Sequence, residues 1–396
     1  MKITDIKAYS FKFRFTPSWP SLDRQGRPLD YYPEYISSSV SARGLRAPDA
    51  DGFVKVMMIE IETDEGVSGI HMPLSQALTV ELILQVLRPF LIGMNPLANR
   101  TIYDKISRFE NRARGGTFNS AISSIDNALW DLKGKAAGMP VYALLGGGRT
   151  RLQPYVSTLG CDTNNPDHVA EYARKVRDMN VWGQKWFFRY GPSSGIEGMK
   201  KNIALVQTVR DAAGPDARIM FDVSCAWDMN YCVKMLPYLE EANLTWLEEP
   251  FRPDRFEMFK RLSEKTNIPI ATGEKLFNRF EVHELLKTGG VDILQPEPES
   301  FGGVTEAMRT GELCEMYGAQ YSPHGSGFMP LVSVTAAMSP DISPTFEFLW
   351  RSGTSAIAML KDPPVIEADG FITMDERPGL YHPDYDRIVE KTEIKL

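Results

Sequence analysis

From about residue 152 onward, short strand-like runs alternate with longer amphipathic stretches, and this rhythm constrains the fold more than any other feature of the chain. The stretches between the runs carry helical periodicity. The expected strands are QPYVSTLG, GQKWFF, RIMFDVS, LTWLEEP, IPIATGE, VDILQPE, AQYSPHG and TFEFLW. Alternating βα units predict an α/β fold, a parallel sheet with helices outside. Eight regular units favour a closed barrel over an open sheet.

The first 150 residues have a different character. MKITDIKAYSF, FVKVMMIEIET and GVSGIHM are typical of strands, and residues 80–91 and 118–135 are expected to be helical. Between the first two strands, residues 17–51 are rich in Pro, Ser, Arg, Tyr and Gly and show no periodicity. Loops of this length are generally functional or disordered. We predict a mobile specificity loop, with a disordered insertion as the alternative.

Composition excludes several classes of protein. The 396 residues are 43% hydrophobic and 24% charged with a net charge of −7, which is ordinary for a globular protein. No basic run suggests nucleic acid or an anionic membrane as a partner, and no stretch approaches 18 apolar residues. The four cysteines are too sparse for a disulfide framework. GxGxxG and Walker motifs are absent and the amino terminus lacks a signal peptide, so we expect a cytoplasmic enzyme.

The chemistry-bearing side chains recur at the ends of the expected strands. Successive members of the set are 26, 26, 23, 27 and 23 residues apart, about one βα unit each. The carboxyl ends of barrel strands share one face, where barrel enzymes have their active sites. The set consists of Asp222, Glu248, Glu274, Glu297, His324 and Glu347.

Converging carboxylates repel one another unless a cation is present. Asp222, Glu248 and Glu274 on three adjacent strands therefore predict a site for a hard, oxygen-preferring ion, most simply Mg²⁺. A single carboxylate at a strand end is usually a helix N-cap or a solvated charge, but six groups in register are not explained in that way. The remaining histidines are expected to be structural, His71 being the least clear of them: His71, His168, His283 and His382.

Several longer motifs resemble a known family over nearly the whole chain. They are SAISSIDNALWDLKGKAAGMPVYALLGG, FDVS, WLEEP, ATGEK, DILQPE, GGVTE, PHG and TFEFL. In order and spacing they resemble the mandelate racemase subgroup of the enolase superfamily, and within it the acid-sugar dehydratases of the rhamnonate dehydratase-like branch.

The resemblance implies an architecture and a cofactor. It implies a modified TIM barrel, (β/α)7β, under an α+β capping domain built from both ends of the chain. The expected boundaries are 1–150 for the cap with its loop at 17–51, 151–350 for the barrel, and 351–396 for a segment that returns to the cap. It also implies Mg²⁺ held by Asp222, Glu248 and Glu274, and proton removal from the carbon beside a substrate carboxylate.

Two positions depart from the family pattern. His324 matches the family's base, but its partner here is Glu297 where the family usually has Asp. The longer arm could re-angle the pair, or another acceptor such as Glu299 could replace it. On the second strand, Lys185 matches the first lysine of Lys-x-Lys, whereas Phe187 takes the place of the second. Phenylalanine cannot transfer a proton, so racemisation, which needs a base on each face, is disfavoured.

A dehydratase can work with one base, because His324 can take the α-proton and return it to the departing hydroxyl. Lys185 would help to neutralise the substrate carboxylate, unless it is an ordinary surface lysine. Glu347 matches a residue that hydrogen-bonds that carboxylate, and it would have to be protonated to donate. Arg189 and Tyr190 could meet a sugar hydroxyl, although a loop arginine is usually solvated.

The sequence therefore predicts a Mg²⁺-dependent dehydratase that converts an aldonate-type acid sugar into its 2-keto-3-deoxy product. The alternatives are a cycloisomerase or epimerase with the same early chemistry, and a catalytically silent relative that binds metal or ligand. The expected partner is a small acid sugar, and the resemblance suggests a homo-oligomer, either a dimer or an octamer. The side chains that the 17–51 loop could bring to the substrate are Asp23, Arg24, Arg27, Tyr31, Tyr32, Arg43 and Arg46.

Overall fold

A curled sheet of parallel strands forms the centre of the protein. The computed structural model describes residues 1–14, 25–35, 52–74, 77–111, 114–325, 328–350 and 356–395. In this part of the chain the sheet has eight strands in the order β11-β10-β9-β8-β7-β6-β5-β12. They are β5 (Tyr155–Ser157), β6 (Gly183–Phe187), β7 (Ile219–Asp222), β8 (Trp246–Glu248), β9 (Ile270–Thr272), β10 (Ile293–Leu294), β11 (Gln320–Tyr321) and β12 (Glu347–Leu349).

The two edge strands of this sheet meet through the segment that leads into β12. The amide of Tyr321 donates to the carbonyl of Ile342 at 2.7 Å, and the amide of Glu347 donates to the carbonyl of Pro323 at 3.4 Å. The strands are therefore arranged as a barrel whose last seam is irregular. This arrangement brings the ends of β11 and β12 to the same mouth as the other strands.

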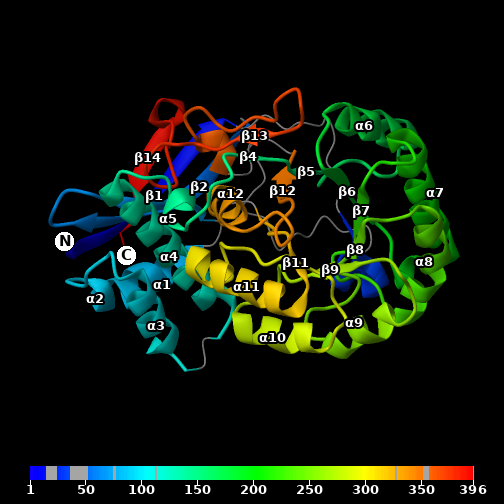
Figure 1. Ribbon diagram of the computed structural model, residues 1–396, viewed down its shortest axis with the longest axis horizontal. Coiled ribbons are helices and arrows are strands. Elements are labelled where there is room, and N and C mark those ends of the chain that lie inside the picture. The colour runs from blue at the N-terminus through cyan, green and yellow to red at the C-terminus, as the bar shows by residue number, and fades with distance from the viewer. Residues whose placement is uncertain are drawn as a thin grey trace.

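Helices alternate with the barrel strands and cover the outside (Figure 1). Among the described residues they are α6 (Pro166–Asp178), α7 (Gly195–Ala213), α8 (Met229–Glu241), α9 (Phe256–Ser263), α10 (Arg279–Lys287), α11 (Gly303–Tyr317) and α12 (Met329–Ala337). Three of them begin with a side-chain cap on the first turn, from Asn165, Asp228 and Asn278. The predicted (β/α)7β order is confirmed.

A second, antiparallel sheet lies beside the barrel, with order β14-β1-β2-β3. It contains β1 (Ile3–Arg14), β2 (Phe53–Thr63), β3 (Gly69–Leu74) and β14 (Glu390–Glu393). Its helical elements are α1 (Ala77–Leu82), the π-helical η3 (Ile83–Leu87), α2 (Arg88–Leu91), α3 (Asn99–Phe109), α4 (Gly116–Ala137) and α5 (Val141–Leu144). We call this sheet and these helices the cap, and Figure 1 shows both labelled chain ends on its side of the molecule.

Short elements complete the described chain. β4 (Arg151–Leu152) pairs antiparallel with β13 (Ile372–Thr373). The 3-10 turns are η1 (Pro28–Tyr31), η2 (Pro33–Tyr35), η4 (Pro192–Ser194), η5 (Ala356–Met359) and η6 (Tyr385–Arg387).

The carboxylate of Asp131, on α4, fastens the carboxyl-terminal segment to the cap. It accepts from the amides of Ile70 at 2.8 Å, Leu380 at 2.7 Å and Tyr381 at 3.1 Å, and from the ammonium of Lys135 at 2.6 Å. Since a buried carboxylate is costly unless it is paired, these donors account for its burial. One side chain thus ties a cap strand and the end of the chain to the same helix.

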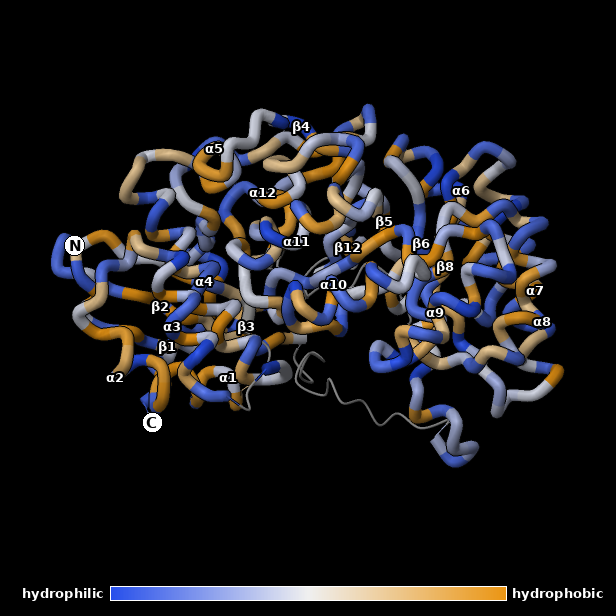
Figure 2. The backbone as a smooth tube through the Cα atoms, turned by 60° about the horizontal axis from the view of Figure 1, so that its bottom comes forward, coloured by the Kyte–Doolittle hydropathy of each residue, from blue (hydrophilic) through white to orange (hydrophobic). Residues whose placement is uncertain are grey.

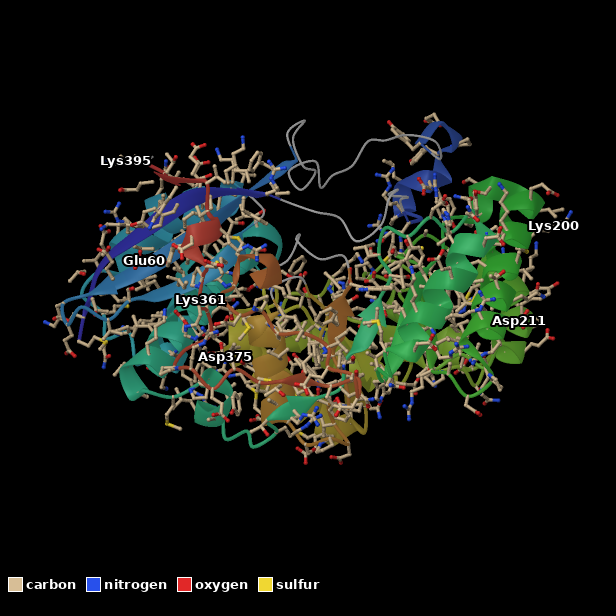
Figure 3. The ribbon with its side chains drawn as sticks, turned by 90° about the horizontal axis from the view of Figure 1, so that it is seen from above. Glu60, Lys200, Asp211, Lys361, Asp375 and Lys395 are labelled. Carbon is tan, nitrogen blue, oxygen red and sulfur yellow. The ribbon has the colours of Figure 1, made fainter. Side chains whose placement is uncertain are left out.

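Apolar side chains gather inside both parts of the molecule. The strands β1, β2 and β5 are marked by hydrophobic segments in Figure 2, and the strand residues of the barrel are nearly all buried. Charged side chains are found on the outside, for example Lys200 and Asp211 on the exposed face of α7 (Figure 3). None of the helices in the described ranges combines the length and apolarity needed to cross a membrane.

Candidate active site

Three carboxylates, two of them buried and the third, Glu274, partly buried, follow one another around the mouth of the barrel. Asp222 and Glu248 are the last residues of β7 and β8 and stand opposite each other in the strand register. Glu274 comes two residues after the end of β9. Burial, together with the negative charge of Glu248, holds the pKa of Asp222 well above its usual value. The three carboxylates predicted as metal ligands are therefore brought to one face and repel one another.

Glu248 is held from inside the barrel. Its Oε1 lies 2.5 Å from Nζ of Lys185, and its Oε2 accepts from Trp246 Nε1 at 3.0 Å and from Gln295 Nε2 at 2.8 Å. Lys185 is fully buried, and its Nζ also lies 3.0 Å from Oε1 of Glu347. Burial alone would lower the pKa of Lys185, but the two carboxylates raise it well above its usual value. Lys185 is thus an internal cation and not a surface lysine.

His324 faces two of the carboxylates with one ring nitrogen. Its Nε2 lies 2.7 Å from Oε2 of Glu274 and 3.2 Å from Oε2 of Glu347. Burial alone would lower the pKa of His324, but these carboxylates raise it to about 10. The other nitrogen, Nδ1, is buried and has no hydrogen-bond partner among the described residues.

The structure does not join Glu297 to His324 by a hydrogen bond, although the two are close. Glu297 lies beside Gly325: a side chain at that glycine would place its Cβ 3.2 Å from Cγ of Glu297. The charge of Glu297 is one of those that raise the pKa of His324. The pairing of Glu297 with Nδ1 therefore stays a prediction, as does the alternative acceptor Glu299.

Glu347 differs from the expectation that it is protonated. It lies between two cations, the ammonium of Lys185 and the ring of His324. Burial would raise the pKa of Glu347, but these positive charges lower it. In this arrangement the neighbouring positive charges favour the ionised form of Glu347, whereas the sequence predicts a protonated form; the role of Glu347 at the substrate stays a prediction. Glu347 here lies within ion-pair distance of both cations, 3.0 Å from Nζ of Lys185 and 3.2 Å from Nε2 of His324.

Lys275 and Glu249 belong to the site but were not predicted from the sequence. The ammonium of Lys275 pairs with Glu249 and lies 2.6 Å from Oε1 of Glu274. Burial would raise the pKa of Glu274, but His324 and Lys275 hold it well below its usual value. The only available signal was adjacency, since each of these residues directly follows an expected ligand, Glu248 or Glu274.

The backbone after the first two ligands is strained. Ser224, Cys225 and Glu249 have φ values of 50°, 60° and 45°, in the left-handed region that favours glycine. The turn after β7 brings the amide of Ser224 to Oδ1 of Asp222 at 2.6 Å. Strain of this kind persists where the surrounding structure enforces it, and it is concentrated at functional sites.

Arg189 lies at the end of β6, where the described part of the 17–51 loop meets the barrel. Its guanidinium lies 5.8 Å from the ring centre of Tyr190. The amide of Gly26 donates to the carbonyl of Phe188 at 2.7 Å, and Ser193 donates to the carbonyl of Tyr31 at 2.9 Å. Arg27, Tyr31 and Tyr32 thus belong to a segment that docks beside β6, whereas the other predicted loop contacts lie outside the described residues: Asp23, Arg24, Arg43 and Arg46.

Phe187 and His71 are both packed in the protein interior. Phe187 is level with Asp222 in the strand register, and Nζ of Lys185 lies 5.5 Å from its ring centre. His71 is buried in the cap, where its Nδ1 lies 2.9 Å from the hydroxyl of Tyr381. Burial lowers the pKa of His71 to about 3. His71 is therefore a neutral core residue.

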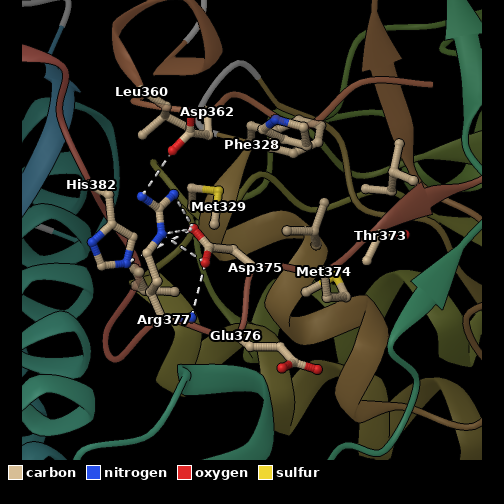
Figure 4. A pocket seen from close by; sticks show the side chains of 14 residues that line it. Phe328, Met329, Leu360, Asp362, Thr373, Met374, Asp375, Glu376, Arg377 and His382 are labelled. Carbon is tan, nitrogen blue, oxygen red and sulfur yellow. Dashed lines mark hydrogen bonds and ion pairs between the residues drawn. The ribbon is translucent and has the colours of Figure 1, made fainter. Parts of the chain in front are cut away.

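A cavity of about 310 Å³ lies elsewhere, between α12 and the carboxyl-terminal segment (Figure 4). Arg377 crosses it, with Nη2 2.6 Å from Oδ2 of Asp375 and Nη1 3.6 Å from Oδ2 of Asp362. His382 lies close to the same guanidinium (Figure 4). None of the predicted site residues lines this cavity, so it is separate from the carboxylate cluster.

The donor set suits a hard divalent cation, although the side chains are turned to other partners. Asp222, Glu248 and Glu274 supply only carboxylate oxygens, which Mg²⁺ prefers, and they lie on consecutive barrel strands. As they stand, no three acidic, histidine or cysteine side chains of the described residues are arranged to hold an ion. The reason is that Lys185, Lys275 and His324 already pair with two of the three carboxylates. The three carboxylates therefore have the right chemical type and the right strand positions to hold the ion. To do so, two of them must exchange their present ion pairs with Lys185, Lys275 and His324 for the metal.

Comparison with known proteins decides the family. Residues 50–146 match the model of the mandelate racemase / muconate lactonizing enzyme N-terminal domain, and residues 167–380 match the enolase C-terminal domain-like model. The chain belongs to the mandelate racemase / muconate lactonizing enzyme family of the enolase superfamily. The resemblance expected from the motifs is thereby confirmed.

Individual members of this family give further detail. L-rhamnonate dehydratase of Saccharopolyspora erythraea is 30% identical over 90% of this chain and 88% of its own length. D-galactarolactone cycloisomerase of Agrobacterium fabrum is 29% identical over 82% of this chain and 87% of its own length. The crystal structure of rhamnonate dehydratase from Gibberella zeae complexed with Mg superposes with a TM-score of 0.84 at 24% identity, covering 98% of this chain and 96% of that one. This last likeness supports the fold.

Proposed function

We propose that this protein is a Mg²⁺-dependent acid-sugar dehydratase, a hydro-lyase acting on an aldonate-type substrate. The observation that carries the proposal is the position of His324, the one histidine at the mouth of the barrel among the described residues, within ion-pair distance of Glu274. The similarity to a chain named L-rhamnonate dehydratase, over 90% of this sequence, supports the substrate class. The family's preference for metal-assisted chemistry is matched by the three carboxylates.

The proposed reaction begins at the carbon beside the substrate carboxylate. His324, in its neutral form, takes the proton from C2, and the electron pair of that bond moves toward the carboxylate. The electrons then return to form a C2–C3 double bond and expel the 3-hydroxyl group, which leaves as water with the proton from His324. The resulting enol tautomerises to the 2-keto-3-deoxy acid. Bound Mg²⁺ would supply positive charge for the substrate carboxylate.

The remaining residues have supporting roles in this proposal. Asp222, Glu248 and Glu274 hold the cation. Lys185, whose Nζ lies 2.5 Å from Oε1 of Glu248, fixes this metal ligand from inside the barrel. Glu297 orients His324 through the ring nitrogen that has no other described partner. Arg189 and the loop beside it face the distal end of the substrate.

A cycloisomerase is the second candidate, because a chain named D-galactarolactone cycloisomerase is 29% identical over 82% of this sequence. A C2 epimerase is less well supported, since Phe187 leaves the second face of C2 without a base. A silent binding protein would have no need for both His324 and an intact carboxylate set.

The test is a screen of the Mg²⁺-loaded protein against a library of acid sugars, with semicarbazide detection of 2-keto-3-deoxy acids. We expect a hit that disappears with EDTA and in His324→Asn. Turnover that persists in His324→Asn would remove the proposed base. Absence of any hit from protein that binds Mg²⁺ would shift the assignment to cycloisomerisation or silent binding.

A further inference from the structure

Helix α4 presents a buried polar stripe to the barrel loop that follows Glu297. The stripe residues are spaced four, three, one and three apart, which places them on one helix face. They are the buried Asn119, Ser123, Asp126 and Asn127, and the partly buried Trp130.

The stripe bonds to the loop at five positions. Asn127 donates to the carbonyl of Pro298 at 3.3 Å, and Ser123 Oγ accepts from the amide of Gly302 at 2.7 Å. Asp126 accepts from the amide and hydroxyl of Thr305 at 2.8 and 2.6 Å. Further bonds join Asn127 to the amide of Val304 at 3.0 Å, Trp130 to the hydroxyl of Thr305 at 2.9 Å, and Asn119 to the carbonyl of Ser300 at 2.6 Å. Side chains of the cap thus form hydrogen bonds along the whole length of this loop.

The loop backbone is shaped to fit this helix. Gly302 and Gly303 have φ values of 101° and 75°, where side chains are strained. A Cβ on Gly302 would lie 2.8 Å from the hydroxyl of Tyr103, and one on Gly303 would overlap the Asp126 carboxylate. The contact therefore depends on two glycines that no larger residue replaces without moving the helix or the loop.

Asn119 does more than join the cap to one loop. Its Nδ2 donates to the carbonyl of Phe277 at 2.7 Å as well as to that of Ser300. Phe277 lies three residues after Glu274, and Ser300 lies three residues after Glu297. One buried amide thus bridges the turn behind a proposed metal ligand and the turn behind the proposed partner of His324.

We propose that Asn119 is a positioning residue. It fixes the turn behind the proposed metal ligand Glu274 relative to the turn behind Glu297, the proposed partner of His324. This inference rests on the proposed function. The rest of the stripe mainly caps the start of α11, but of the stripe's hydrogen bonds among the described residues, only that of Asn119 to Phe277 reaches the Glu274 turn. Both acceptors are backbone carbonyls, so only a side chain with two N–H donors in this place satisfies them together.

The test compares Asn119→Asp, which keeps the shape and removes both donors, with Ser124→Ala as the matched control. Ser124 is buried on the same helix, but its hydroxyl bonds within α4, to the carbonyl of Ser120. Ser123→Ala is a milder second variant that frees only the Gly302 side of the contact. The measurements are amide exchange of residues 274–278 and 297–303, Mg²⁺ affinity by calorimetry, the melting temperature, and kcat and KM on the substrate found by screening.

We expect Asn119→Asp to speed exchange in both segments, to weaken Mg²⁺ binding about tenfold and to lower kcat about 10- to 100-fold, as loss of supporting hydrogen bonds does at metal sites. Ser123→Ala should speed exchange only in 297–303. Equal exchange and equal Mg²⁺ affinity in Asn119→Asp and Ser124→Ala, whatever the melting temperatures, would overturn the inference. If the wild-type protein dehydrates no acid sugar, exchange and Mg²⁺ affinity still decide the role of Asn119, so the two proposals fail separately.

Discussion

Nε2 of His324 lies 2.7 Å from Oε2 of Glu274, so the proposed base is paired with a proposed metal ligand. Together with Glu347, this contact raises the pKa of His324 to about 10, and the imidazole in this arrangement is protonated near neutral pH. A protonated ring cannot take a proton from substrate. Glu274 cannot pair fully with the imidazolium and bind a metal ion at the same time. We therefore expect that Mg²⁺ binding weakens this ion pair and favours the neutral form of His324 that can act as the base.

The first prediction concerns the metal. Asp222→Asn and Glu274→Gln each remove one of three anionic ligands, and we expect either variant to lose measurable Mg²⁺ binding in calorimetry and all activity. EDTA should abolish wild-type turnover, and added Mg²⁺ should restore it. Glu281→Gln is a matched control, because its carboxylate accepts from the amide of Phe277 outside the ligand set. Unchanged Mg²⁺ affinity in Asp222→Asn would show that the ion binds elsewhere.

The second prediction separates the two candidate partners of His324. If Glu297 orients the ring through Nδ1, Glu297→Gln should lower kcat about 10- to 100-fold with little change in KM, as loss of an orienting hydrogen bond does. Glu299→Gln, two residues along the same turn, should stay near wild type. The reverse pattern in steady-state kinetics would make Glu299 the partner.

The third prediction concerns the buried cation at the centre of the barrel. Lys185→Met leaves Glu248 and Glu347 without their shared ammonium, which lies 2.5 and 3.0 Å from them. Breaking a buried ion pair in this way costs about 3–5 kcal/mol in the free energy of unfolding. Urea denaturation measures the loss, with Lys200→Met on the exposed face of α7 as the control. A loss no larger than that of the control would mean that Lys185 is not held as an ion.

The fourth prediction is a pH dependence of stability due to His71. Its folded-state pKa of about 3 lies below the ordinary 6.5, so the unfolded chain binds a proton more readily. Stability is therefore lost as pH falls below 6.5, by about 2 kcal/mol between pH 7 and pH 5 from the one-proton linkage. His71→Gln can still meet the Tyr381 hydroxyl but does not titrate, so its unfolding free energy should change less over that range. Parallel curves for both proteins would assign the acid sensitivity to other groups.

Much of the fold could be predicted because each barrel strand carries its own local signals. The helix expected over 118–135 is α4, and Gly138 ends it with a φ of 66° after the apolar face is complete. The ends of the strands could be predicted as well. Asp222 and Glu248 each follow an apolar run, and they lie opposite each other in the strand register, as their spacing predicts. Periodicity and spacing are local properties, and they are written directly in the sequence.

The partners of these side chains could not be predicted, because they depend on distances across the barrel. Lys185 was expected to neutralise the substrate carboxylate, but nothing in the sequence indicated that its ammonium pairs with Glu248 and Glu347. Glu347 was expected to be protonated by burial, but two neighbouring cations lower its pKa. Asn119 bridges residues 158 and 181 positions away, and no short motif announces such a contact. Whether the pKa of a buried group rises or falls depends on which charges lie next to it, and these neighbours are known only from the folded structure.

In the proposed reaction one base, His324, removes the C2 proton, and the 3-hydroxyl leaves as water. The most direct measurement is proton NMR of wild-type protein with Mg²⁺ and an acid sugar in D₂O, following product and remaining substrate together. We predict a 2-keto-3-deoxy acid that carries solvent deuterium at C3, while the remaining substrate keeps its C2 configuration because Phe187 offers no second base. A C2 epimer, or a rearranged ring in place of the keto acid, would contradict the account.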